Sequence, residues 1–163
     1  MLTFGQILVR LVVAAVLAGI IGLEREFKHK PAGLRTNILV SVGSALIMMV
    51  SIMAAGYNGD ASRIASGVIT GVGFLGAGLI IQSRGEVHGL TTAATIWLVS
   101  AVGLSVGIGF YSAAFLTTII SLIVLYFFRS DKIMEKFNNH ENYDSLEDDV
   151  DGSGPDVNRN DYE

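Results

Sequence analysis

The stretch IASGVITGVGFLGAGLII, residues 64–81, contains no charged side chain and no proline. Lipid offers no partners to backbone N–H and C=O groups, so an apolar run of this length has to form a helix or part of a closed barrel. Barrel strands would be about 10 residues long and would alternate apolar with polar residues. This stretch does not alternate, and it therefore predicts a transmembrane α-helix.

Four further apolar runs of similar length flank this one. With it they give five expected spans: Phe4–Leu23, Asn37–Ala55, Ile64–Ile81, Leu90–Gly109 and Tyr111–Phe128. The pattern predicts an all-α, polytopic membrane protein with five transmembrane helices, of which the glycine-rich third is central. Hydrophobic residues make up 51% of the chain and charged residues 16%, and there is no cysteine. These values exclude a disordered spanning region and a disulfide-built secreted domain.

The beginning of the chain has a competing interpretation. Arg10 followed by the apolar run Leu11–Leu23 resembles the charge-then-apolar order of a signal peptide. A small-x-small cleavage pattern is absent, however, and Glu24, Arg25 and Glu26 follow directly. A first transmembrane helix is the better interpretation.

Basic residues predict the orientation in the membrane. One side holds loop one, loop three and the start of the tail, and the other side holds Arg63 alone. The basic residues of the first side are Arg25, Lys28, Lys30, Arg35, Arg84, Arg129, Lys132 and Lys136. Because Lys and Arg favour the cytoplasmic side, we expect the N-terminus outside and the C-terminus in the cytoplasm.

The charge also divides the chain into two expected domains. Residues 1–128 carry a formal charge of +3 and form the five-helix membrane domain, whereas residues 129–163 carry −7. High charge with few apolar residues predicts a mostly disordered cytoplasmic tail. A docking segment for a basic partner is the alternative.

Residues 71–78, GVGFLGAG, match the dinucleotide fingerprint G-x-G-x-x-G. That fingerprint works between a strand and a helix N-terminus, and here it lies in mid-span, so nucleotide binding is rejected. Small residues allow helices to approach closely in lipid, which makes packing the better interpretation. At 100° per residue, one face carries Gly67, Gly71 and Gly78, and the opposite half carries Ser66, Gly73, Gly76 and Ala77. We therefore expect neighbouring helices on both faces of this helix. In the fourth span, Gly103 and Gly107 lie four residues apart and are also expected to allow close helix packing.

Several polar residues at or near the spans have structural interpretations beside functional ones. Arg10 lies inside the first span, where snorkelling to the interface and a functional role are equally supported. Asp60 is expected to cap the third helix, with Arg63 as its i,i+3 partner. The polar opening of the fourth span is expected to provide capping and helix–helix hydrogen bonds; it consists of Thr91, Thr92 and Thr95. Trp97 lies inside that span and is expected to pack.

The loops and the glycine span together resemble the MgtC/SapB family of bacterial membrane proteins. The resemblance covers about residues 5–128 and rests on five stretches: GLERE at 22–26, PAGLRT at 31–36, Asp60 with RIA at 63–65, GVGFLGAG at 71–78, and GLTTAAT at 89–95 with Trp97. It implies an inner-membrane protein linked to growth under magnesium limitation. Members were first named as candidate magnesium transporters, and the family is now seen rather as regulating other membrane machines, including the proton-driven ATP synthase. Longer members carry a folded C-terminal domain, in place of which this chain has its acidic tail.

The resemblance also implies functional charged residues at matching positions. Acidic residues of the family's motifs match Glu24, Glu26 and Asp60, and basic ones match Arg25 and Arg35. We expect a functional charge cluster, which includes Arg63 as well. No cofactor is evident and no metal ligand set can be assigned, although the resemblance implies Mg²⁺ as the relevant ion. Expected partners are the lipid bilayer and a second copy or other membrane proteins, with no nucleic acid.

Two functions compete, a regulator that acts through helix–helix contacts and a transporter of magnesium or another ion. Mg²⁺ prefers carboxylates and retained water, so a path across the bilayer should show acidic or amide groups at mid-depth. In the spanning region all four carboxylates lie at span ends or in loops: Glu24, Glu26, Asp60 and Glu86. This favours the regulator. An enzyme is not expected, because no nucleophile–base pair is evident.

Overall fold

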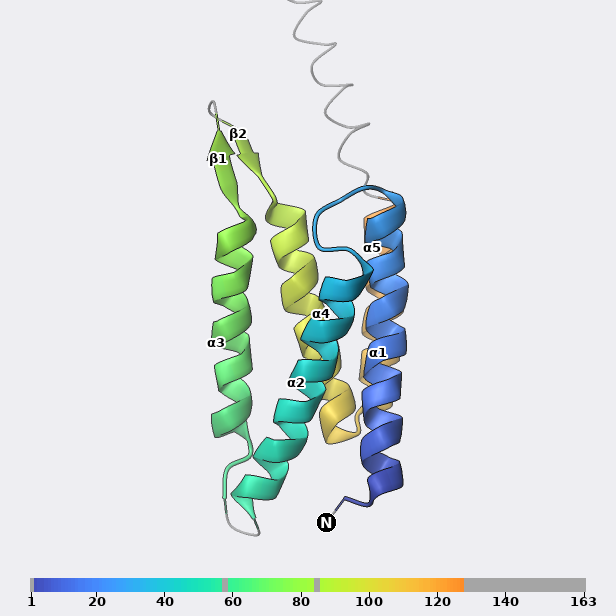
Figure 1. Ribbon diagram of the computed structural model, residues 1–163, viewed down its shortest axis with the longest axis vertical. Coiled ribbons are helices and arrows are strands. Elements are labelled where there is room, and N and C mark those ends of the chain that lie inside the picture. The colour runs from blue at the N-terminus through green and yellow to red at the C-terminus, as the bar shows by residue number, and fades with distance from the viewer. Residues whose placement is uncertain (1, 57–58, 84–85, 128–163) are drawn as a thin grey trace, which may run out of the picture. The chain divides into compact units, whose positions relative to one another are not determined.

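The computed structural model describes residues 2–56, 59–83 and 86–127. The chain divides into two units, residues 1–124 and 125–163. Its elements, shown in Figure 1, are α1 (Phe4–Phe27), α2 (Leu34–Ala55), α3 (Ser62–Leu79), β1 (Ile81–Ser83), β2 (Glu86–His88), α4 (Leu90–Ile108) and α5 (Tyr111–Phe127). The expected acidic tail, residues 129–163, lies outside the described residues.

The prediction of an all-α, polytopic membrane protein is confirmed. Helices α1 to α4 are each long and apolar enough to cross a membrane. Helix α5 has 17 described residues, or about 26 Å at 1.5 Å per residue. Helix α1 continues to Phe27, beyond the expected end at Leu23, because an ion pair between Glu24 and Lys28 supports its last turn.

The centre of the first unit is the contact between α2 and α4, the largest between any two elements. A side chain at Gly103 of α4 would collide with the backbone of Ser41 on α2. One turn on, a Cβ at Gly107 would come within 2.6 Å of the Ala45 carbonyl oxygen. The two backbones can approach this closely only because both positions are glycine. Gly103 and Gly107 thus lie where α4 approaches α2 most closely, as expected of packing residues.

Around this contact lies an apolar core to which α1 and α5 also contribute. Its buried members are Ala14, Leu17, Ala45, Val102, Val106 and Ala114. Helix α1 contacts both α2 and α4, and Figure 1 shows it running antiparallel to α4. The core consists of small and β-branched side chains, which agrees with the short distance between the helices.

Helix α3 does not occupy the central place that we expected of it. Its main contacts among the described residues are with α2 and α4, and Figure 1 shows it at the edge of the bundle. Its buried residues lie on one face: Ala65, Val68, Val72 and Gly76. The correction has a physical reason. The glycines that permit the closest backbone approach are those of α4, so α2 and α4 take the centre.

A short antiparallel hairpin between α3 and α4 was not expected from the sequence. Ile81 pairs with His88 and Gln82 with Val87. Three-residue strands are too short to show the alternation that identifies a strand. Gly89 then adopts φ +88°, a left-handed conformation that favours glycine, and α4 begins.

The close α2–α4 contact leads to a first prediction. Gly103→Ala should lower the free energy of unfolding by about 1–3 kcal/mol, because the new methyl group overpacks against Ser41. Thermal unfolding of the purified chain in detergent measures this. Gly73→Ala is the matched control, since nothing lies within 4 Å of a Cβ at that position. It should be neutral or raise stability by up to about 1 kcal/mol. Equal losses in the two variants would contradict the proposed contact.

Candidate functional site

The carboxylates near the C-terminal end of α1 are engaged in local contacts. Glu24 forms an ion pair with Lys28, one turn further on. Glu26 accepts a hydrogen bond of 2.8 Å from the backbone N–H of Leu34, the first residue of α2. That N–H is one of the groups that a helix leaves without an internal partner, so Glu26 caps α2 from a neighbouring element. Both carboxylates thus stabilise the turn between α1 and α2.

Arg25, between these two carboxylates in the sequence, is buried, with only 4% of its surface exposed. Its Nη2 donates a hydrogen bond of 2.9 Å to Oγ1 of Thr92, in the first turn of α4. Its Nε has no hydrogen-bond partner among the described residues. The structure therefore brings Glu24, Arg25, Glu26 and Thr92 to one end of the bundle. Among the three threonines expected to form helix–helix hydrogen bonds, Thr92 accepts one from Arg25 of α1.

An amide that the sequence analysis did not single out organises the same turn. Asn37 is fully buried, and its Nδ2 donates hydrogen bonds to the carbonyl oxygens of Ala32 (2.6 Å) and Gly33 (2.8 Å). Ala32 and His29 have φ values of +57° and +51°, which residues other than glycine rarely adopt. The Asn37 amide holds Ala32 in this conformation. The available signal was that Asn37 is the only amide in an otherwise apolar span.

The other members of the expected charge cluster lie elsewhere. Arg35 is exposed on the first turn of α2, and none of the hydrogen bonds or ion pairs among described residues links it to Glu24 or Glu26. Asp60 and Arg63 lie at the start of α3, which Figure 1 shows at the opposite end of α2 from the α1–α2 turn. Helix α2, with 22 residues, separates those ends by about 33 Å. The six residues therefore do not form a single site.

Asp60 supports the beginning of α3 as a cap would. Its Oδ1 accepts a hydrogen bond of 2.8 Å from the backbone N–H of Ser62. Hydrogen bonding from the side chain and the backbone of Ser62 holds the pKa of the Asp60 carboxyl below its ordinary value. The predicted side-chain pair with Arg63 is wrong, since no ion pair joins them in the described part of the chain. Instead the Arg63 backbone N–H donates to the Asp60 carbonyl oxygen at 3.4 Å.

Arg10 has a role that neither of the two open interpretations anticipated. Its Nη1 donates a hydrogen bond of 2.5 Å to the carbonyl oxygen of Gly107, in the last turn of α4. The last carbonyls of a helix lack internal partners and carry the negative end of the helix dipole. Arg10 therefore stabilises the C-terminus of α4 and fastens α1 to it.

The remaining polar residues of α4 differ in part from expectation. Gly89 begins the helix without any side-chain cap, so the predicted capping by the threonines is wrong. Thr95 donates instead to the Thr91 carbonyl oxygen at 2.7 Å, within the helix. Trp97 is 48% exposed, so within this chain it is not the buried packing residue that we expected.

The glycines of α3 mostly face open space within this chain. No atom lies within 4 Å of a Cβ built at Gly67, Gly71, Gly73 or Gly78. At Gly76 such a Cβ would lie 3.5 Å from that of Ala93 on α4, an ordinary packing distance. Packing within the chain is thus found for Gly76 but not for the other four, because α3 lies at the edge of the bundle.

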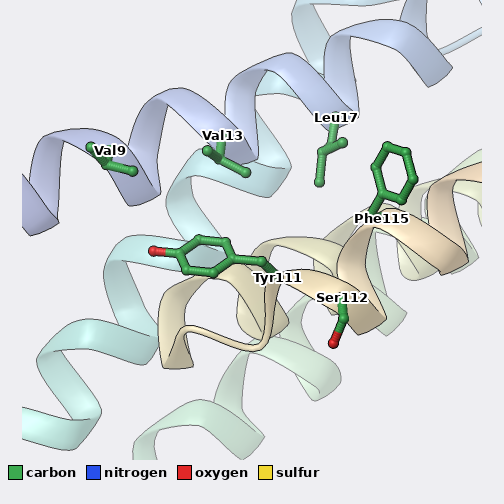
Figure 2. Close-up of a pocket in the computed structure, with 6 residues that line it drawn as sticks. All are labelled: Val9, Val13, Leu17, Tyr111, Ser112 and Phe115. Carbon is green, nitrogen blue, oxygen red and sulfur yellow. The ribbon is translucent and has the colours of Figure 1, made fainter.

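Two open apolar grooves run along the helices. One, of about 600 Å³, lies between α2 and α3 and includes Gly43, Gly67 and Gly71 in its lining. The other, of about 510 Å³, separates α1 from α5. Figure 2 shows the α1 side chains of this second groove facing those of α5, with Ser112 turned away; the residues drawn are Val9, Val13, Leu17, Tyr111, Ser112 and Phe115.

The described residues contain no group of three or more His, Cys, Asp or Glu side chains that could hold a metal ion. The model of the MgtC family matches residues 11–132 of the chain.

The chain belongs to the MgtC family. It is 43% identical over 127 residues to an Escherichia coli K12 protein named "Putative magnesium transporter YhiD", 44% over 111 residues to Protein MgtC of Brucella abortus, and 44% over 129 residues to Protein SrpB of Synechococcus elongatus. These matches cover 74%, 68% and 71% of this chain and 59%, 46% and 71% of those relatives. The chain thus spans about three fifths of the Escherichia coli relative. No solved structure matches it.

The contact between Arg10 and α4 gives a prediction for this MgtC-family chain. Arg10→Gln should lower the free energy of unfolding by about 1–3 kcal/mol, the range for a lost hydrogen bond to a charged group. Chemical or thermal unfolding in detergent measures it. Arg63→Gln is the matched control, because Arg63 is exposed and should change stability by less than about 0.5 kcal/mol. An Arg10 variant as stable as the Arg63 variant would show that the bond to Gly107 contributes nothing.

Proposed function

We propose that this MgtC-family chain is a non-enzymatic membrane regulator that acts through helix–helix contacts and is linked to adaptation to magnesium limitation. The observation that carries the proposal is the outward face of α3. Gly67 and Gly71 line an open groove against α2, and a Cβ at either position would meet no atom within 4 Å. Such a surface lets a transmembrane helix of another protein approach the α3 backbone.

The polarity of α3 supports this use of its free face. Of the four long helices, α3 is the least apolar on average and also the least buried. A helix that met only lipid on its free face would be expected to be the most apolar of the set, since lipid cannot match polar groups. This combination supports the proposal that another protein covers this face.

The partner class follows from the same surface. Small residues spaced four apart, such as Gly67 and Gly71, suit a close helix crossing, whether the helix comes from a second copy of this chain or from another membrane protein. We place the protein in the bacterial inner membrane, with the N-terminus outside and the C-terminus in the cytoplasm. The excess of Lys and Arg in the loop between α1 and α2 supports that orientation.

Transport of magnesium or another ion is the second candidate, and the name of the Escherichia coli relative favours it. The contacts of the acidic residues favour the regulator instead. Glu24 pairs with Lys28, Glu26 caps α2, and Asp60 accepts a hydrogen bond from Ser62. Carboxylates engaged in this way are less available to a hard cation, which prefers free carboxylate oxygens and water.

Helix–helix contact through α3 can be tested by cross-linking in native membranes. Gly71→Leu should abolish cross-links formed from cysteines placed on α3, because the side chain fills the groove that the partner helix needs. Gly73→Leu is the matched control, since it is equally open but lies about 200° away around the helix. Both variants should keep the thermal stability of the parent chain. Cross-linking that persists unchanged in Gly71→Leu would refute contact at this face.

Reconstitution into liposomes loaded with a magnesium-sensitive dye separates the two functions. The regulator should give no Mg²⁺ entry above that of protein-free vesicles under a concentration gradient. Matched vesicles holding an ionophore provide the positive control. Protein-dependent entry of Mg²⁺ would overturn the regulator and establish the transporter.

A further inference from the structure

Arg10 lies beside one end of the apolar groove between α1 and α5. Its neighbour Val9 lines that groove, and so does Tyr111, the first residue of α5. At 100° per residue, Arg10 is about 20° from Leu17 around α1, so its side chain leaves the helix at the edge of the groove-lining face. A Cβ at Gly109, two residues before Tyr111, would lie 3.1 Å from Nη2 of Arg10. The guanidinium is therefore close to the segment that leads into α5.

The contact between Arg10 and α4 sets the depth of the guanidinium in the membrane. Its Nη1 donates to the carbonyl oxygen of Gly107, in the last turn of α4, and the turn into α5 follows at Gly109 and Phe110. Lipid cannot satisfy the free backbone groups of a turn, so this turn lies near the membrane surface. Arg10 is therefore at the depth at which the polar headgroup region begins.

The described residues leave much of the Arg10 guanidinium without a partner. Arginine has five N–H donors, and in the part of the chain that the structure describes only Nη1 donates a hydrogen bond, to Gly107. Nε is buried with no partner there, and no carboxylate among these residues forms an ion pair with Arg10. The C-terminus of α4 supplies only about half a negative charge. A full anion beside Arg10 therefore completes both the charge balance and the hydrogen bonding.

The groove that begins beside Arg10 is apolar along its length. Figure 2 shows the Tyr111 hydroxyl pointing toward the end of the groove at Val9, and the Phe115 ring at the end near Leu17. From Val9 to Leu17 the groove follows α1 for about 12 Å at 1.5 Å per residue. Its lining holds no glycine, in contrast to the groove between α2 and α3, so it does not suit the close approach of another helix. A flexible hydrocarbon chain fits it better.

We propose that the groove between α1 and α5 binds an acyl chain of an anionic phospholipid, whose phosphate lies against Arg10. A phosphate can accept two parallel hydrogen bonds from a guanidinium, and the Tyr111 hydroxyl is a further donor at this end of the groove. Polar groups at one end and apolar side chains along the rest match the order of headgroup and chain in a phospholipid.

A lipid in this place also explains how α5 is held. Of the described residues that form the apolar core around α2 and α4, only Ala114 comes from α5. The acyl chain adds contacts to both α1 and α5 along the groove, and it therefore stabilises the position of α5. This inference is independent of the helix contact proposed for α3, which involves a different groove.

The test compares three probes on the full chain, purified in detergent without phospholipid. Phosphatidylglycerol carries the phosphate and the acyl chains, a diglucosyl diacylglycerol with the same chains lacks the phosphate, and inorganic phosphate lacks the chains. We expect phosphatidylglycerol to raise the melting temperature, and the other two probes to leave it close to the value without a probe, at equal ionic strength. An equal rise with the glycolipid would refute the role of the charge, and an equal rise with inorganic phosphate would refute the role of the groove. No rise with phosphatidylglycerol would refute the site.

Arg10→Gln removes the charge that binds the phosphate. This variant should need at least about ten-fold more phosphatidylglycerol for half of the maximal shift in melting temperature, the size expected when a charge-assisted hydrogen bond is lost. Arg63→Gln is the control, because Arg63 is an exposed cation that does not line this groove, and it should respond like the parent chain. Equal lipid dependence of the two variants would contradict a phosphate contact at Arg10.

Two valines of α1 test the groove itself. Val9 and Val12 are equally exposed, at 53% and 52%, but only Val9 lines the groove. Val9→Trp should raise the phosphatidylglycerol concentration for half of the shift by about ten-fold, the loss expected when two methylene groups of the chain are displaced. Val12→Trp should respond like the parent chain. Both variants keep Arg10 and its bond to Gly107, so this comparison decides the matter even if Arg10→Gln does not fold. Equal responses of the two tryptophan variants would refute binding in this groove.

Discussion

The close approach of α2 and α4 is the constraint on which the rest of the bundle depends. In lipid there is little hydrophobic driving force between helices, so contact between them relies on van der Waals packing at short distance. Gly103 and Gly107 allow the α4 backbone to reach that of α2 at Ser41 and Ala45. Once these two helices are joined, α1 and α3 can each pack against both of them, and the contacts of the bundle show this arrangement.

Polar contacts at the ends of the helices fix how the helices are aligned along one another, which non-directional apolar packing does not determine. Arg10 and Arg25 fix α1 lengthwise along α4 by bonds near its two ends. The Asn37 amide and the Glu26 carboxylate close the turn that carries the chain from α1 into α2. Each of these polar groups would be costly if left without a partner beside lipid, which makes them specific as well as stabilising.

The sequence predicts the helices well because an apolar run in lipid has few structural options. The expected spans agree with the observed helices apart from a few residues at the ends, as at Leu23, where the charged turn that follows remains helical. Which helix is central could not be predicted, since glycine marks a possible close approach without naming the neighbour. A Cβ at Gly103 would meet the backbone of α2, whereas a Cβ at Gly71 would have no atom of the described residues within 4 Å.

The sequence indicated which polar residues matter at the helix ends, but it did not indicate which residues they contact. Burial of Arg25 against Thr92 joins positions 67 residues apart, and no local pattern reveals such a pair. The six residues do not form one cluster, because the 22 residues of α2 separate Asp60 and Arg63 from the turn between α1 and α2. The distribution of basic residues had already placed Arg63 on the other side of the membrane. Asn37 was overlooked because a single amide in an apolar run carries no periodic signal, although its burial makes its hydrogen bonds obligatory.

The glycines of α4 and those of α3 have different structural roles. Those of α4 pack inside the bundle, whereas most of those of α3 lie on its outer surface. Gly103 and Gly107 of α4 contact α2 directly, so substitutions at these positions should lower the stability of the fold. The outward glycines of α3 contribute no contact within the chain, and alanine would be the better helix former at such open positions. A local stability cost without an internal benefit is the pattern expected where a surface is shaped for an external partner. Helix α3 is also the least apolar of the four long helices, which agrees with the proposal that its outward face meets another protein.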